Sequence, residues 1–236
     1  MHHVHVDSWS QGKSVLHARD PRAKILTLLV FLTVLATTPA DAALTLGIDA
    51  AVLVAGILIA GLPLLQLLSR AMVVLPFSLT FGLISWMTGD HLRAIGLVEK
   101  SYLSAAAVLL IVGTTSLPAL LNGFEKLGAP RMLVLVAQFI YRYLFVISEQ
   151  AQHMRLAASA RQGDPRLHGK GRFRAAAGAL AVLFARSYYR ADGIHRAMLA
   201  RAFTGRFPLL SSLHFRLADG LFLLTASAFL IVVRTQ

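Results

Sequence analysis

Residues 20–38 read DPRAKILTLLVFLTVLATT, and this stretch decides the fold class. Asp20 followed by Pro21 predicts a helix start, because Asp caps free backbone N–H groups and Pro fits the first helical turn. An uncharged apolar run, Ile25–Thr38, follows directly. Four further runs resemble it: Ala42–Leu62, Ala71–Met87, Tyr102 to about Thr115, and Leu217–Val233. Runs of this length and apolarity predict helices that cross a lipid bilayer.

The composition supports the same fold class. Of the 236 residues, 56% are hydrophobic and 14% are charged, against about 25% charged in an ordinary soluble domain. A soluble domain of this size could not bury so much apolar surface. The runs are continuous and not alternating, which excludes a membrane β-barrel. We therefore predict an all-α integral membrane protein.

Several classes of chemistry are excluded or left to partners. The chain has no cysteine, which rules out disulfides, thiolate metal sites and thiol catalysis. It has no Walker A, His-Glu-x-x-His or Gly-x-Ser-x-Gly motif, so we predict no catalytic residues and assign any ATP hydrolysis to a partner. The formal charge of +12 favours contact with anionic lipid over nucleic-acid binding, because basic and aromatic residues are not interleaved.

A strongly basic region separates the fourth apolar run from the last. Its apolar stretches are interrupted by Arg142 and Arg186, which favours long amphipathic helices beside or on the membrane. Gly and Pro residues predict three helices here, from about 117 to 127, 130 to 163 and 172 to 204. The whole pattern predicts about five transmembrane helices plus three long cytoplasmic or interfacial coupling helices.

The predicted organisation has four parts. They are a cytoplasmic amino-terminal segment (1–24), transmembrane helices 1–4 (25–115), cytoplasmic coupling helices (116–216) and a last transmembrane helix (217–236). With the amino terminus and the coupling region in the cytoplasm, 20 of the 23 Lys and Arg residues lie inside, which satisfies the positive-inside rule. The exceptions are Arg93, Lys100 and Arg234. In this multi-pass arrangement Asp90, His91 and Glu99 fall in an outer loop.

One motif occurs twice in the basic region. Ala-x-x-Ala-Arg spans residues 157–161 and again 197–201, each time predicted in the last turn of a helix shortly before a glycine. The small alanines leave the helix end thin, and the planar guanidinium suits a carboxylate or carbonyl cluster in a partner. The alternative is that each Arg only complements the helix dipole. The repetition favours the first interpretation.

At these residues the sequence resembles the transmembrane coupling (T) component of energy-coupling-factor (ECF) transporters, in its cobalt-type CbiQ subfamily. The resemblance covers most of the chain. It is carried by residues 20–24, by Leu120–Pro130, and by the motifs Ala160-Arg161-Gln162 and Ala200-Arg201-Ala202. The family often has Gly or Ser where this chain has Gln162 and Ala202. Both arginines are in place.

The resemblance implies a non-catalytic subunit of an ABC-type importer in the cell inner membrane. Its implied partners are two ATP-binding ATPase subunits, a membrane substrate-binding (S) subunit such as CbiM, and CbiN as a further small subunit. ATP and Mg²⁺ would bind to the ATPases, and this chain would bind no cofactor. The implied role of Arg161 and Arg201 is coupling to the ATPases. The expected cargo is Co(II); nickel, biotin or another vitamin is the alternative. An unrecognised intramembrane enzyme is the rival class.

Two further features remain open. The histidines His2, His3 and His5 would suit a metal ion, but a polar tail or tag remnant is the other interpretation, and we assign no metal site to the chain. Asp49 lies inside an apolar run, where an acid is a functional candidate unless it sits at the membrane interface.

Overall fold

The computed structural model describes residues 9, 12, 14–39, 42–160, 169–205 and 217–234. These described residues form helices and turns without any strand, which confirms the all-α prediction. The chain divides into two compact units. The first comprises Met1–Gly128 with Ser211–Gln236, and the second comprises Ala129–Leu210.

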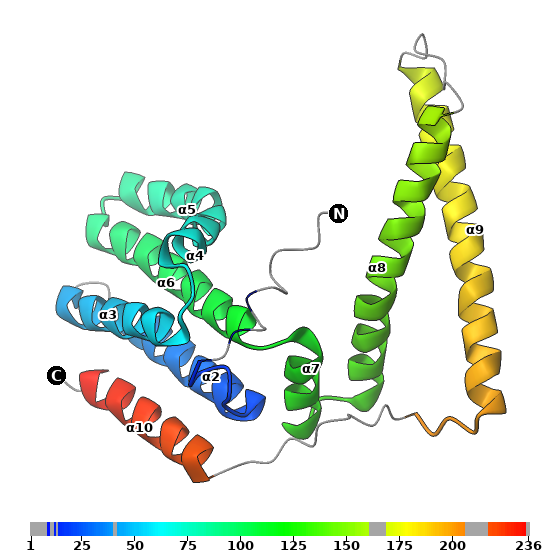
Figure 1. Ribbon diagram of the computed structural model, residues 1–236. Helices are drawn as coiled ribbons and strands as arrows, with labels where there is room; N and C mark the ends of the chain where they lie inside the picture. Colours follow the sequence, from blue (N-terminus) through cyan, green and yellow to red (C-terminus); the bar gives the residue numbers. More distant parts are fainter. Residues whose placement is uncertain are drawn as a thin grey trace. The chain divides into compact units, whose positions relative to one another are not determined.

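The first unit holds the helices that the apolar runs predict. In chain order they are α2 (Pro21–Thr37), α3 (Ala43–Ala60), α4 (Leu64–Ala71), the short 3-10 helix η1 (Met72–Val74), α5 (Leu75–Met87), α6 (His91–Thr114), α7 (Leu117–Lys126) and α10 (Leu217–Arg234). Figure 1 shows the last helix, α10, beside the first long one, α2, and the two are in contact. Helix α2 also packs on α6 and α7, while α6 packs on α3, α4 and α5.

The core of this unit is built mainly from faces of α2, α3, α4 and α6. On α3 the buried residues Leu46, Leu53, Ile57 and Ala60 recur at helical spacing and face the core. They meet buried side chains of the neighbouring helices, namely Phe31, Val34, Leu35, Leu67, Ala71, Ala106 and Ala107. The amino-terminal segment also contributes, since Trp9 and Leu16 pack against this cluster.

The start of α2 is as predicted. The helix begins at Pro21, and the carboxylate of Asp20 accepts a hydrogen bond from the backbone N–H of Arg22 at 2.9 Å. The cap satisfies one of the donors that a helix start leaves free.

The prediction of an outer loop around Asp90, His91 and Glu99 is wrong. Helix α6 begins at His91, well before the apolar run, and Glu99 lies inside it. Asp90 is its N-cap, and its carboxylate accepts from the N–H of Arg93 at 3.1 Å. The polar first turns are helical because the cap and the packing against α5 stabilise them, although hydropathy there is low.

The segment between the second and third apolar runs, residues 63–70, is also largely helical. Leu64–Met87 is almost continuously helical through α4, η1 and α5. Arg70 lies in α4, with its guanidinium 4.1 Å from the ring centroid of Trp9. This cation–π contact ties the amino-terminal segment to α4.

Three helical stretches of the described chain are long and apolar enough to cross a membrane: Leu64–Met87, His91–Thr114 and Arg131–Ala160. Two shorter apolar stretches, Leu44–Ala60 of α3 and Leu217–Ala228 of α10, match the second and last predicted spans. The third stretch lies in the region that we assign to coupling helices. The number of spans therefore stays a prediction.

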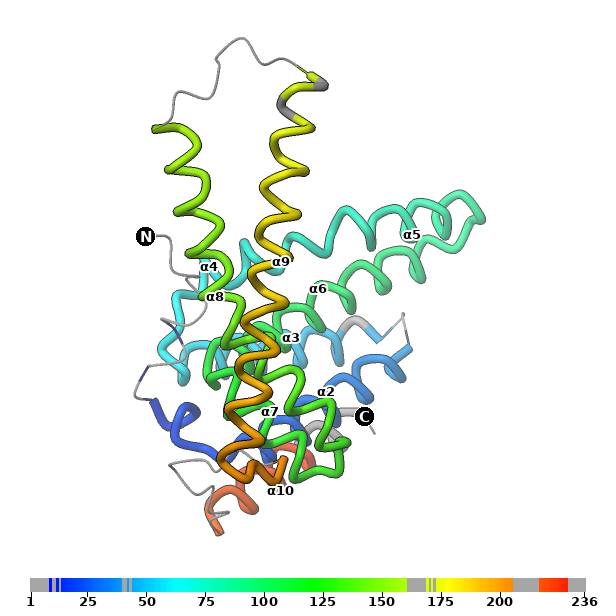
Figure 2. Tube along the Cα trace, turned by 90° about the vertical axis from the view of Figure 1, so that its right-hand side faces the viewer, coloured from blue at the N-terminus to red at the C-terminus, as the bar shows by residue number. Residues whose placement is uncertain are grey.

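The second unit is a pair of long helices, α8 (Arg131–Ala160) and α9 (Lys170–Ala200). They run in opposite directions, as both Figure 1 and Figure 2 show. Two of the three predicted coupling helices are thus present here, and the third matches α7. One boundary is wrong: α9 ends at Ala200 and not near Thr204. The cause is a C-terminal cap at Arg201 and Ala202.

Candidate functional site

The second copy of the Ala-x-x-Ala-Arg motif forms the carboxyl end of α9. Ala200 is the last helical residue, and Arg201 is the C-cap, with φ −96° and ψ 15°. Arg201 is therefore one residue beyond the helix, and not within its last turn as the sequence predicts. Ala200, Arg201 and Ala202 are all exposed.

Backbone hydrogen bonds close this helix end. The N–H of Arg201 donates to Met198 O at 3.1 Å, that of Ala202 to Leu199 O at 3.0 Å, and that of Phe203 to Met198 O at 3.0 Å. Ala202 adopts φ 52°, in the left-handed region. A residue there cannot continue a right-handed helix, so α9 stops before Thr204.

The side chain of Arg201 is available to a partner. Within the described part of the chain it makes no ion pair or side-chain hydrogen bond. Two nearby arginines of α9 differ: Arg196 pairs with Asp192 at 2.8 Å, and Arg190 donates to Gln150 of α8 at 3.4 Å. Arg201 thus presents an exposed guanidinium at a helix end flanked by alanine.

The first copy of the motif lies at the other end of the helix pair. Ala160 is the last residue of α8 and is exposed, whereas Arg161 and Gln162 lie outside the described residues. Because α8 and α9 run in opposite directions, Ala160 and Ala200 mark opposite ends of the pair (Figure 1). The 31 residues of α9 correspond to about 45 Å of helix.

The helix pair exposes much apolar surface. Met132, Val136, Ile140 and Leu144 form an exposed row on α8, one helical turn apart. On α9 the exposed large side chains include Phe173, Leu180, Phe184 and Tyr188. In the described part of α8, Val134 alone is buried. Surface of this kind is typical of contact with a protein partner or with lipid.

A buried ionic cluster lies in the first unit, and sequence reasoning did not find it. Lys24, only 1% exposed, donates through Nζ to Thr114 O at 3.0 Å and to Thr115 Oγ1 at 2.8 Å. The backbone N–H of Asp20 donates to Asp219 Oδ1 at 3.3 Å. The cluster therefore joins the starts of α2 and α10 to the end of α6. Asp219 lies at the start of the last apolar run, Leu217–Val233, and this position was its only signal.

Asp49 is buried among the helices of the first unit. It is 1% exposed, it lies on the inward face of α3, and its Oδ1 has no hydrogen-bond partner among the described residues. The described residues also hold no group of three His, Cys, Asp or Glu side chains that could bind a metal ion. His2, His3 and His5 lie outside the described residues.

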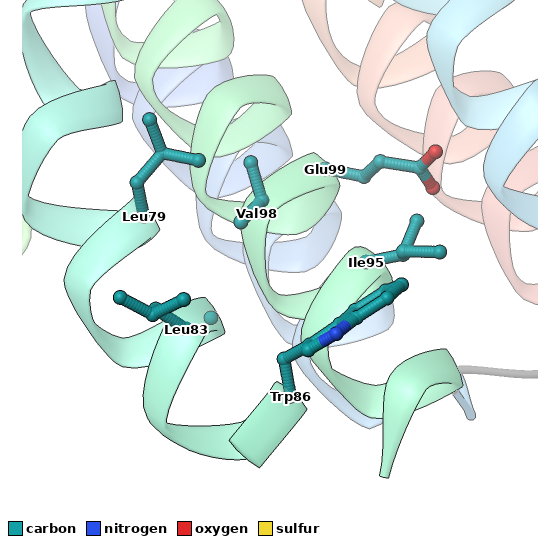
Figure 3. A pocket seen from close by; sticks show the side chains of 8 residues that line it. Leu79, Leu83, Trp86, Ile95, Val98 and Glu99 are labelled. Carbon is teal, nitrogen blue, oxygen red and sulfur yellow. The ribbon is translucent and has the colours of Figure 1, made fainter. Parts of the chain in front are cut away.

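An open groove of about 460 Å³ follows the seam between α5 and α6. Figure 3 shows Leu79 and Leu83 of α5 on one side and Ile95 and Glu99 of α6 on the other. Gly82 lies in its floor, where a Cβ atom would come 3.0 Å from Val98 Cγ2. Glu99 is the only charged residue in the lining.

Comparisons with known proteins identify the family. Residues 12–210 match the family model described as "CbiQ: Cobalt transport protein". The chain is 29% identical over 108 residues to an uncharacterized protein of Methanocaldococcus jannaschii (46% of this chain, 40% of that protein). It is 29% identical over 156 residues to the cobalt transport protein CbiQ of Rhodobacter capsulatus (60% and 62%). It is 24% identical over 233 residues to the energy-coupling factor transporter transmembrane protein EcfT of Thermosediminibacter oceani (87% and 86%).

The chain spans less than two thirds of the length of the first two of these relatives. The fold and the matches together define a class, the α-helical transmembrane components of ECF transporters. Within that class, the chain belongs to the CbiQ cobalt transport protein family. The family is a transporter component and not a family of enzymes.

Proposed function

We propose that this chain couples two ATPase subunits to a membrane substrate-binding subunit in an ECF-type importer. The observation that carries the proposal is Arg201, exposed on its alanine-flanked cap and without an ion pair among the described residues, at the opposite end of the α8–α9 pair from Ala160. Ends separated by about 45 Å could contact two ATPase subunits at once. ATP and Mg²⁺ belong to those subunits in this proposal.

The exposed apolar rows of α8 and α9 supply the second half of the mechanism. Closure of the ATPase pair on ATP binding would move the two helix ends as a rigid body. The rows would carry that movement to the substrate-binding subunit, for which CbiM, with CbiN, is the candidate. The proposed location is the inner membrane, with the α8–α9 pair on the cytoplasmic side.

Co(II) is the proposed cargo. The family match and the CbiQ relative support it, whereas the EcfT relative keeps nickel, biotin and other vitamins as alternatives. Uptake of Co²⁺, Ni²⁺ and biotin by the assembled transporter distinguishes these cargoes. Biotin uptake without metal uptake would contradict the cobalt proposal. Turnover of a substrate by the isolated chain would instead favour the rival class, an intramembrane enzyme.

The coupling role is tested by Arg201→Ala, alone and combined with Arg161→Ala. If Arg201 enters a desolvated acidic groove, its loss costs about 2–5 kcal/mol of docking free energy. We expect weak ATPase copurification and little uptake, while the chain still enters the membrane. Arg201→Lys should also be impaired, because Lys lacks the planar fork.

The matched control is Arg174→Ala. Arg174 is exposed near the other end of α9 and, like Arg201, makes no ion pair within the described residues. This variant should assemble and transport normally. Normal assembly and uptake by the double variant of Arg161 and Arg201 would reduce both arginines to helix-end charges.

A further inference from the structure

Ala202 stands apart from the rest of the described backbone. It is the only described residue other than glycine with a positive φ. The left-handed region brings Cβ close to the following carbonyl oxygen, so residues with a side chain avoid it. A positive φ at alanine therefore persists only where the surrounding structure imposes it.

The hydrogen bonds at Ala202 are those of a Schellman motif. Counting back from the C-cap Arg201, the Phe203 N–H reaches the carbonyl of the third-last helical residue, Met198, and the Ala202 N–H reaches that of Leu199. Ala202 occupies the position after the C-cap, which usually holds glycine. The third residue of the Ala-Arg-x motif thus decides where the helix ends.

This cap affects the side chain of Arg201 directly. A basic side chain near a helix end commonly binds the last free carbonyls. Here the carbonyls of Met198 and Leu199 already accept backbone N–H groups. The guanidinium is therefore not needed to satisfy them, and the alanine at 200 leaves it unobstructed.

We propose that Ala202 is a positioning residue, whose left-handed backbone ends α9 and directs Arg201 outward to its partner. The inference rests on the proposed coupling function. It requires that any residue compatible with a left-handed backbone preserves the contact. It also requires that a residue of similar size that disfavours the left-handed backbone displaces Arg201 from the contact, even though Arg201 itself is unchanged.

The test measures binding of the purified ATPase pair to the full-length protein in nanodiscs, for variants at position 202. Glycine has no Cβ and asparagine tolerates the left-handed region, so Ala202→Gly and Ala202→Asn should bind like the natural protein. Valine is β-branched and strongly disfavoured there. Ala202→Val should weaken binding about tenfold or more, a ratio that corresponds to about 1.4 kcal/mol.

Thr204→Val is the control, since Thr204 is exposed nearby and has no positive φ; it should bind normally. If Ala202→Asn and Ala202→Val weaken ATPase binding equally, the cause is a lost surface contact, and the positioning role is overturned. Normal binding by Ala202→Val would overturn it as well. If Arg201→Ala weakens binding while Ala202→Val does not, the coupling function stands and only this inference fails. Normal binding by Arg201→Ala would overturn both.

Discussion

At the scale of single residues, the contacts of Lys24 in the structure differ from what its place in the sequence indicates. In the sequence it is a basic residue that flanks an apolar run. In the structure its ammonium group is buried against the carbonyl of Thr114 and the hydroxyl of Thr115, near the acids Asp20 and Asp219. A buried cation is tolerated only when hydrogen bonds and opposite charge compensate its desolvation.

We predict that Lys24→Met destabilises the protein by about 1–3 kcal/mol, because it leaves the buried carbonyl of Thr114 and hydroxyl of Thr115 without their donor. The apparent melting temperature of the purified protein in detergent measures the change. Lys126→Met serves as control, because Lys126 is exposed at the end of α7. A Lys24→Met protein as stable as the natural one would contradict this account of the cluster.

At the scale of elements, the α5–α6 pair depends on small residues at its contact. Ser78 and Gly82 are the buried residues of α5, four positions apart, and they let the two helices approach closely. Close approach through small residues is the usual way in which membrane helices associate. The space at Gly82 is limited by Val98 Cγ2, 3.0 Å from the position that a Cβ would take.

We predict that Gly82→Leu lowers stability by about 1–3 kcal/mol through overpacking of this contact. Combining it with Val98→Ala should restore part of the loss, because the valine methyl is the nearest obstacle. Gly47→Leu on α3 is the matched control, since no atom lies within 4 Å of its Cβ position. Melting curves in detergent compare the variants, and equal effects at positions 82 and 47 would show that the contact is not limiting.

At the scale of the whole molecule, the position of α8 decides which helices cross the membrane. Helix α8 meets the length and apolarity of a span, yet it carries Arg142 in its middle and the sequence assigns it to the cytoplasmic side. The positive-inside rule places most basic residues of the chain inside. If α8 spans the membrane, its two ends lie on opposite sides. If α8 is a cytoplasmic helix, both ends lie in the cytoplasm.

We predict that Arg131→Cys and Ser159→Cys, near the two ends of α8, are both labelled from the cytoplasm, whereas Thr88→Cys between α5 and α6 is labelled from outside. The natural chain has no cysteine, so each variant carries one reactive thiol. Labelling with an impermeant thiol reagent in intact cells and inverted vesicles gives the side. Labelling of positions 131 and 159 from opposite sides would make α8 a transmembrane span.

The sequence by itself determined the class of protein and most of its helices. Apolar runs and low charge require lipid around a helical chain, and local signals such as Asp20-Pro21 set the start of α2. It also identified Ala200-Arg201-Ala202 as a candidate site, because the motif repeats at a fixed offset.

Only the tertiary structure decided where α6 begins, where α9 ends and what Lys24 contacts. Helix ends depend on backbone dihedral angles. The left-handed residue that ends a helix is usually glycine, so the alanine at position 202 did not indicate a helix end in the sequence. The neighbourhood of Lys24 and Asp219 joins residues far apart along the chain. Such pairings follow from how helices pack, because the desolvation of a charge depends on everything around it and not on its neighbours in sequence.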